Sequence, residues 1–206
     1  MVDGDWLKWA RRVHDIARNG ITYTDGPFDR QRYEELDRIA IEMLGSITGT
    51  DPARVRDVYR GESGYVTPKV DVRGVVFRNG RILMVREKED GLWTLPGGWA
   101  DAGDPPSEAV VREIREESGF ETEAVRILAV YNRESHDVPP LPWHVYKIFL
   151  RCEIVGGSER HSIETDGVDF FGPDEIPPLS TGRTTAYQIR RMFEHLRDPD
   201  LHADFD

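Results

Sequence analysis

The hydrophobic pattern of the chain changes near residue 61, from a helical spacing to a strand-like alternation. Over residues 5–60, apolar side chains recur three or four positions apart, as they do on one face of an amphipathic helix. The pattern predicts helices on both sides of a break at Gly26-Pro27, and a third short helix over 52–60. From Val70 onward, apolar and polar residues alternate instead, which is typical of half-buried strands.

Each of the two longer predicted helices has one apolar stripe. The first stripe comprises Trp6, Trp9, Ala10, Val13, Ile16 and Ala17, and the second comprises Tyr33, Leu36, Ala40, Met43, Leu44 and Ile47. Some sixty residues form only a marginal core, so we expect this part to pack on the rest of the chain or on another subunit. We interpret its tryptophans as packing residues rather than as ligand contacts.

The second part of the chain is predicted to be a mixed sheet with a few helices packed on it. Its first two strands, 70–77 and 81–86, flank Asn79-Gly80, a pair that tolerates positive φ and is typical of a two-residue hairpin. Further strands are predicted over 122–131, 143–155 and 168–171, and a last helix over 183–197. The fold class is therefore α/β, with a small all-α domain over 1–62 and a mixed domain over 63–206.

Composition narrows the functional classes. The 27 Lys and Arg against 38 Asp and Glu give a net charge of −11, which disfavours a coat for nucleic acid or for an anionic membrane. No apolar run reaches the roughly 20 residues of a membrane span, and the first residues lack the features of a signal peptide. The single cysteine, Cys152, shares a strand face with apolar residues, so we expect a core thiol in a cytoplasmic protein.

Residues 95–120 form a loop, a helix and a second loop that carry the candidate chemistry. Asp104 is predicted to cap a helix that begins at Pro105, and Gly119 to end it in a left-handed turn. At 100° per residue, three glutamates fall within an arc of roughly 100°, while the apolar residues of the helix face a core. The glutamates are Glu113, Glu116 and Glu117, and the apolar residues are Val110, Val111 and Ile114.

Three neighbouring carboxylates on one helix repel each other by about 0.2–0.5 kcal/mol per pair, which Arg112 and Arg115 offset only in part. A hard divalent cation would turn this repulsion into coordination, because carboxylates and waters are the ligands that Mg2+ prefers. The alternative is a solvated acidic face on an ordinary amphipathic helix. The glutamates alone favour the solvated face, and the sequence of the flanking loops shifts the interpretation toward a cation site.

The segment resembles the Nudix box, in which a glycine, a glutamate and an Arg-Glu-apolar-any-Glu-Glu-any-Gly-apolar run stand at fixed spacing. The matching residues are Gly98, Arg112, Glu113, Ile114, Glu116, Glu117, Gly119 and Phe120. Only Asp104 departs, since it stands where the family has Glu. The resemblance implies an α/β/α sandwich, here preceded by the helical module.

The resemblance also implies roles for the acidic residues. Glu116 and Glu117 would bind catalytic Mg2+ or Mn2+, together with Glu113 and the carbonyl of Gly97. Arg112 would hold the box together by pairing with carboxylates. The base that activates water would be either Glu113 or a glutamate in a later loop, for which Glu164 is the candidate and a further metal ligand. The alternative is that Glu164 is a solvated loop carboxylate.

Substrate contacts are less specific in the sequence. Arg73 and Arg86, on the first two strands, are candidate phosphate ligands, although solvent-facing strand arginines are common. Trp99, Tyr131 and His144 are candidates to stack on a base or ribose, although each such residue is more often a packing residue.

The N-terminal part resembles a module found ahead of some Nudix domains, in the segments 6–10, 32–36 and 66–73. That resemblance implies a homodimer that hydrolyses a nucleoside diphosphate linked to another group X, such as ADP-ribose or CDP-choline, and that binds this small nucleotide rather than nucleic acid. A triphosphate pyrophosphohydrolase is the alternative enzyme. A sensor that binds a nucleotide without cleaving it is the third hypothesis, disfavoured because all three box glutamates are present.

Overall fold

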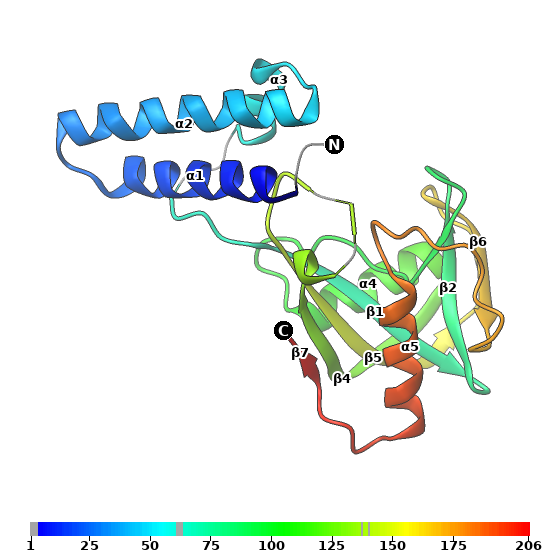
Figure 1. Ribbon diagram of the computed structural model, residues 1–206. Coiled ribbons are helices and arrows are strands. Elements are labelled where there is room, and N and C mark those ends of the chain that lie inside the picture. The colour runs from blue at the N-terminus through cyan, green and yellow to red at the C-terminus, as the bar shows by residue number, and fades with distance from the viewer. Residues whose placement is uncertain (1–3, 61–63, 137, 140) are drawn as a thin grey trace. The chain divides into compact units, whose positions relative to one another are not determined.

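The computed structural model describes residues 4–60, 64–136, 138–139 and 141–206, and the chain divides into two compact units, Met1–Thr67 and Pro68–Asp206 (Figure 1). The boundary predicted between residues 62 and 63 lies outside the described residues. None of the helices in the described part of the chain combines the length and the apolar character needed to cross a bilayer.

The first unit is helical, as predicted. It consists of α1 (Gly4–Tyr23), α2 (Pro27–Thr48) and α3 (Pro52–Val58). Helix α2 begins at Pro27, because proline lacks the N–H that a first turn leaves unpaired, and it ends at Gly49 with φ 66°. The predicted break at Gly26-Pro27 is therefore confirmed.

The apolar stripes of α1 and α2 are only partly buried. The small residues and Leu44 lie inside the unit, but the side chains of Trp6 and Trp9 are 50% and 54% exposed, with their rings 5.2 Å apart. The unit also has a groove of about 440 Å³, which we call the α1–α2 groove. It is lined by Trp6, Ile39, Glu42, Met43, Ser46 and Ile47. The tryptophans are therefore not core residues of this unit, because its small alanine-lined interface leaves them on the outside.

The second unit contains a mixed sheet, as predicted. Its strands are β1 (Lys69–Arg78), β2 (Arg81–Glu87), β3 (Trp93–Thr94), β4 (Phe120–Asn132), β5 (Val145–Gly157), β6 (Thr165–Phe171) and β7 (Asp204–Phe205). The order is β3-β2-β1-β5-β4-β7, with β6 paired to β2. The β1–β5 and β4–β7 pairs are parallel and the others antiparallel. Asn79 and Gly80 have φ of 54° and 77°, which confirms the hairpin between β1 and β2.

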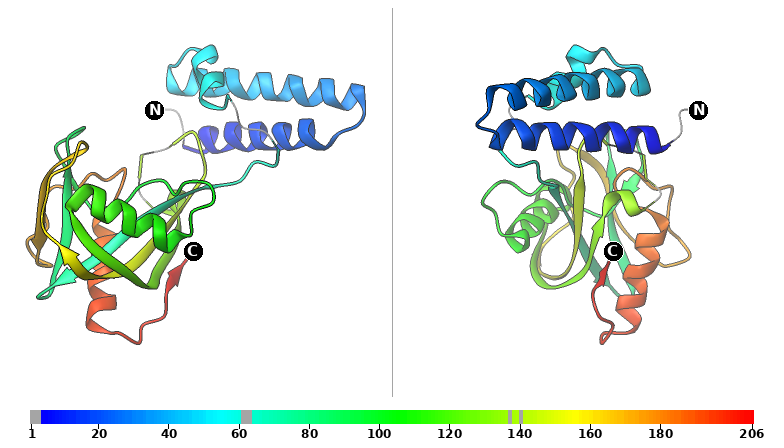
Figure 2. Two further views of the ribbon diagram at one scale, coloured as in Figure 1. Left: turned by 180° about the vertical axis from the view of Figure 1, so that it is seen from behind. Right: turned by 60° about the vertical axis from the view of Figure 1, so that its left-hand side comes forward.

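Helices α4 (Pro106–Ser118) and α5 (Ala186–Arg197) cover opposite faces of this sheet, and a short 3-10 helix, η1 (Arg133–Ser135), follows β4 (Figure 2). Alternate residues of β1 supply both cores: Val72 and Val76 pack toward α4, whereas Val75 and Phe77 pack toward α5. The α/β/α sandwich is confirmed. Cys152 lies wholly buried in the α4 core, where burial raises the pKa of its thiol to about 12.

Several element boundaries differ from the prediction by one to three residues, among them the starts of α4, α5 and β6. Helix α4 begins one residue later, with Pro105 and not Asp104 at the N-cap, because the Asp104 carboxylate pairs with Arg112 instead of with the helix end. Helix α5 begins at Ala186, since Thr185 and Gln188 form a capping box there. Strand β6 begins at Thr165 and not at residue 168. The predicted helix end at Gly119 is confirmed, with φ 80°.

Candidate functional site

A loop that runs beside β1 forms one wall of a cleft in the second unit. The loop is held by three backbone hydrogen bonds of 2.8–3.0 Å, which join residues 96, 98 and 100 to β1. The cleft has a volume of about 560 Å³. It is lined by Asp71, Arg73, Glu87, Gly97, Gly98, Trp99, Asp101, Arg112, Glu113, Glu117, Arg133, Pro139, Leu141, Val145, Lys147, Glu164, Gly182 and Arg183.

Glu117 is the most deeply placed acid of α4. Its residue is only 5% exposed, and its Oε2 accepts the backbone N–H of Gly97 at 2.8 Å. Burial raises the pKa of its carboxyl to about 8, an effect that the nearby Arg73 and the Gly97 N–H only partly oppose. Gly97 has φ 141°, and a Cβ there would lie 2.0 Å from the Val72 carbonyl oxygen. The turn that holds Glu117 therefore requires glycine.

Glu113 lies one turn earlier on the same face of α4. Burial raises the pKa of its carboxyl, while Arg112 opposes the rise through an ion pair of 2.9 Å. A Cβ at Gly98 would stand 2.9 Å from Oε2 of Glu113, so the absence of a side chain at Gly98 leaves open the space in front of this carboxylate. Glu116, in contrast, is half exposed and does not line the cleft.

Arg112 is the centre of a group of acidic side chains. It lies 3.4 Å from both Asp101 and Asp104, 2.9 Å from Glu113 and 3.8 Å from Glu116. The aspartate that replaces the expected glutamate at 104 therefore still reaches Arg112. This pairing fits the role that the resemblance implied for Arg112, that of holding the box together.

Two further glutamates, Glu87 and Glu164, line the same cleft as the α4 carboxylates. Burial raises the pKa of Glu87, and the negative charge of Glu164 adds to that rise; Glu164 acts on Glu113 in the same sense. Glu87 and Glu113 likewise raise the pKa of Glu117. Among the described residues no three His, Cys, Asp or Glu side chains stand close enough to hold an ion. The mutual repulsion of hard oxygen donors nevertheless fits a divalent cation, which would relieve it.

The floor of the cleft carries positive charge. Arg73 donates two hydrogen bonds to the Asp71 carboxylate, at 2.8 and 2.7 Å, and Lys147 lies 3.3 Å from the same group. Burial alone would raise the pKa of Asp71, but these two cations outweigh it and hold that pKa below its usual range. Lys147 is 2% exposed, and burial lowers its pKa to about 7, although Asp71 opposes the effect.

Two cations from distant loops complete the floor. Arg133, in η1, donates to the Gly182 carbonyl at 3.3 Å. Arg183 pairs with Glu87 at 3.2 Å and with Glu89 at 2.6 Å, and its carbonyl accepts a hydrogen bond from Lys147. The cleft thus combines acidic groups from α4, β2 and the segment before β6 with basic groups from β1, β5 and two further segments.

The structure brings part of the predicted site together. The predicted residues that line the cleft are Arg73, Gly97, Trp99, Arg112, Glu113, Glu117 and Glu164. Those that do not are Arg86, Glu116, Tyr131 and His144.

The predicted residues outside the cleft have other contacts. Arg86 pairs with Asp166 at 2.7 Å, and Nδ1 of His144 lies 3.2 Å from a Glu134 carboxylate oxygen. Tyr131 is buried in the α5 core and donates its hydroxyl to Asp204 at 2.7 Å. Its pKa is raised by burial and by that carboxylate.

Apart from Arg73, the cationic floor was missed by reasoning from the sequence. In β1, Asp71 and Arg73 alternate with valines, a pattern that also fits an ordinary solvent-facing side. Lys147 shares this ambiguity in β5. Arg133 and Arg183 lie in loops more than forty residues apart, where spacing gives no signal.

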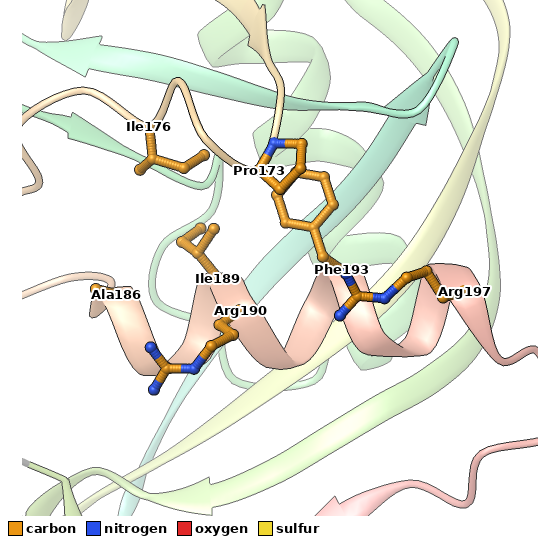
Figure 3. A pocket seen from close by; sticks show the side chains of 7 residues that line it. All are labelled: Pro173, Ile176, Ala186, Ile189, Arg190, Phe193 and Arg197. Carbon is orange, nitrogen blue, oxygen red and sulfur yellow. The ribbon is translucent and has the colours of Figure 1, made fainter.

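A second hollow of about 220 Å³ lies between α5 and the segment after β6 (Figure 3). It is lined by Pro173, Ile176, Ala186, Ile189, Arg190, Phe193 and Arg197. This lining contains no acid, so it offers no ligands for a hard cation and no general base. The cleft at α4 combines acids with several cations and is the candidate active site.

Comparison with protein families divides the chain between residues 59 and 67, close to the boundary between the two structural units. Residues 67–193 match the family described as "NUDIX domain". Residues 4–59 match the family described as "UDP-X-like, N-terminal oligomerisation domain". Both the cleft and the box glutamates lie inside the first of these matches.

Two relatives match the chain over nearly its whole length, and a third matches about two thirds of it. "Putative ADP-ribose pyrophosphatase YjhB" of Bacillus subtilis (strain 168) is 46% identical over 205 residues, which cover 100% of this chain and 99% of that protein. A crystal structure of a UDP-X diphosphatase matches with a TM-score of 0.64 and 32% identity, over 98% of each chain. An ADP-ribose pyrophosphatase from Streptococcus suis matches with a TM-score of 0.62 and 38% identity, over 68% of this chain and 100% of that one.

Proposed function

We propose, from the premise that this chain belongs to the NUDIX domain family, that it hydrolyses the diphosphate bridge of a nucleoside diphosphate linked to another group X, of the ADP-ribose or CDP-choline class. The products would be a nucleoside monophosphate and phospho-X. The relatives that match the chain along its full length, and not only over the NUDIX domain, favour this class over a triphosphate substrate.

The observation that carries the proposal is the charge distribution of the cleft. Glu113 and Glu117 lie on one side, and Arg73 and Lys147 lie on the floor. A diphosphate bridge is itself anionic, so it needs basic groups for binding and a cation between it and the carboxylates. The cleft offers both kinds of group within about 560 Å³.

A divalent cation, Mg2+ or Mn2+, is part of the proposal. Its ligands would be the carboxylates of Glu113, Glu116, Glu117 and Glu164 and the Gly97 carbonyl. The ion would neutralise charge on the diphosphate and lower the pKa of a bound water. The protein's own groups orient the reactants. Arg112 holds Glu113 through their 2.9 Å ion pair, and the Gly97 N–H holds Glu117.

The base that takes the proton from water is either Glu164 or Glu113. Both line the cleft, and burial raises the pKa of Glu113, which makes its carboxylate a stronger proton acceptor. Glu164→Gln distinguishes them: a loss of kcat by orders of magnitude supports Glu164 as the base, and an unchanged kcat transfers the role to Glu113. Glu159→Gln, in the same interstrand segment but outside the cleft lining, is the matched control.

A substrate panel tests the proposal as a whole. The full chain is incubated with ADP-ribose, CDP-choline, UDP-glucose and the common nucleoside triphosphates, in millimolar Mg2+ or Mn2+, and the products are separated by chromatography. We expect nucleoside monophosphate from the diphosphate-linked compounds. Turnover of the triphosphates alone, with release of pyrophosphate, would identify the alternative enzyme. No turnover combined with nucleotide binding would identify the sensor.

We also propose that the α1–α2 groove is the contact between two copies of the chain. The exposed rings of Trp6 and Trp9 and the apolar lining of the groove support a second copy as the occupant, as does the match to an oligomerisation domain. Ile39→Asp should convert a dimer to a monomer in analytical ultracentrifugation. Arg32→Asp, on the exposed surface of the same helix but outside the groove, is the control and should stay dimeric. A wild-type monomer at micromolar concentration would contradict the proposal.

A further inference from the structure

A chain of hydrogen bonds joins the end of α4 to the segment that carries Glu164. The Thr165 hydroxyl donates to the backbone carbonyl of Glu117 at 2.7 Å. Its oxygen also lies 2.9 Å from the Ser162 hydroxyl, which in turn accepts the backbone N–H of Glu164 at 3.0 Å. This series of hydrogen bonds therefore runs from the backbone of one cleft glutamate, Glu117, to the backbone of another, Glu164.

The direction of each bond in this chain follows from the number of protons available. Thr165 has one hydroxyl proton, and the Glu117 carbonyl takes it, because a carbonyl cannot donate. Ser162 must then donate to Thr165, and its lone pairs accept the N–H groups of Glu164 and Thr165, the latter at 2.9 Å. Each hydroxyl and amide proton has one acceptor, so only one set of hydrogen-bond directions is possible.

The end of β2 fixes the same segment from its other side. The Lys88 ammonium donates to the carbonyls of Ser162 and Ile163, at 2.7 and 2.9 Å. The Lys88 backbone N–H donates to the Glu164 carbonyl at 2.9 Å. The backbone of Glu164 is thus held at both its N–H and its carbonyl, while the side chain remains on the cleft.

Part of this arrangement is ordinary helix termination. The last four carbonyls of α4 have no partner within the helix, and the Glu117 carbonyl is one of them. A main-chain N–H or a water would satisfy it equally well. Helix termination does not require the second contact of the buried Thr165 hydroxyl. Its oxygen also lies next to the Ser162 hydroxyl, and that hydroxyl accepts the Glu164 N–H.

We infer that Thr165 is a positioning residue, whose hydroxyl fixes the separation of Glu117 and Glu164 by joining α4 to the segment before β6. Thr165 is wholly buried, so it does not meet the substrate itself. The inference rests on the proposed function, in which Glu117 and Glu164 act on the same diphosphate. Misplacement of a reacting group by about 1 Å lowers rates by up to about 10²-fold, so a link of this kind has a measurable effect.

The test compares Thr165→Val, which keeps the shape and removes the hydroxyl, with Thr165→Ser, which keeps the hydroxyl. We expect Thr165→Val to lower kcat about tenfold with KM changed less than threefold, and Thr165→Ser to restore most of the loss. Thr48→Val is the matched control, because it removes a 2.8 Å hydroxyl-to-carbonyl bond at the end of α2, in the other unit. It should leave kcat unchanged.

A double variant shows whether Thr165 acts through Glu164. If it does, Thr165→Val should change kcat less than twofold once Glu164→Gln is present, because the group it positions is already missing. An equal tenfold loss in both backgrounds overturns the inference. So does wild-type kcat in Glu164→Gln alone, because positioning a group that plays no part in the reaction has no effect.

Amide hydrogen exchange tests the link between Thr165 and Glu164 without metal or substrate. In the metal-free protein, the amide of Glu164 should exchange at least tenfold faster in Thr165→Val and in Ser162→Ala than in the wild type, and Thr48→Val should leave it protected. Unchanged protection in Thr165→Val overturns the inference. A wild type that hydrolyses no nucleoside diphosphate derivative refutes the proposed function instead, so the two failures are distinguishable.

Discussion

Replacing Glu117 with glutamine is expected to stabilise the metal-free protein while it removes catalysis. The carboxyl of Glu117 is buried with a pKa raised from 4.5 to about 8. The unfolded chain ionises this group above its ordinary pKa, whereas the folded protein must keep it protonated or bury a charge. The contribution of Glu117 to the free energy of unfolding is therefore fully present below about pH 4.5. It is lost as the pH rises to about 8.

The magnitude follows from the difference between these pKa values. Each pH unit inside the window lowers the free energy of unfolding by about 1.36 kcal/mol, which amounts to about 3 kcal/mol at pH 7. Glutamine carries no charge at any pH, and its side-chain oxygen can still accept the Gly97 N–H. Glu117→Gln should therefore be more stable than the wild type by up to about 3 kcal/mol at pH 7, and by less than about 1 kcal/mol at pH 5.

The assay is urea denaturation of both proteins in EDTA at pH 5, 6, 7 and 8. Glu116→Gln is the control, because its half-exposed side chain lies on the same helix, and it should stay within about 0.5 kcal/mol of the wild type at each pH. Addition of millimolar Mg2+ should raise the stability of the wild type more than that of Glu117→Gln. A gap between wild type and Glu117→Gln that does not grow with pH would refute the reasoning.

Three further outcomes are expected. Gly97→Ala should lower the free energy of unfolding, measured by urea denaturation, by about 3 kcal/mol or more, because its Cβ would meet a backbone oxygen at 2.0 Å. The control Gly91→Ala, at φ 70° with open space around it, should lose only about 1 kcal/mol. Equal losses in the two variants would contradict the claim. At pH 6, below the Lys147 pKa of about 7, Lys147→Met should raise KM for ADP-ribose on the order of tenfold, since it removes a floor cation; an unchanged KM would exclude that role. Iodoacetamide at pH 8 should modify Cys152 only after unfolding, as mass spectrometry would show, because burial raises its pKa to about 12.

Local features of the fold followed from the sequence. Asn79-Gly80 defined the hairpin, Gly119 ended α4, and the spacing of Glu113 and Glu117 placed both on one helix face. Each of these depends on backbone preferences within a few residues, which the sequence states directly. The cap at Asp104 was predicted wrongly, because its carboxylate pairs with Arg112, eight residues away.

The chemistry of the cleft depended on tertiary structure. Helical periodicity put Glu113, Glu116 and Glu117 on one edge, but only the packing of the Gly97 loop made Glu117 buried and left Glu116 half exposed. Desolvation and Coulomb interactions act through space, so neither the raised pKa of Glu117 nor the floor around Lys147 has a signature in local spacing. The sequence by itself determined which acids the helix carries, and the folded structure decided which of them lose water and which cations they face.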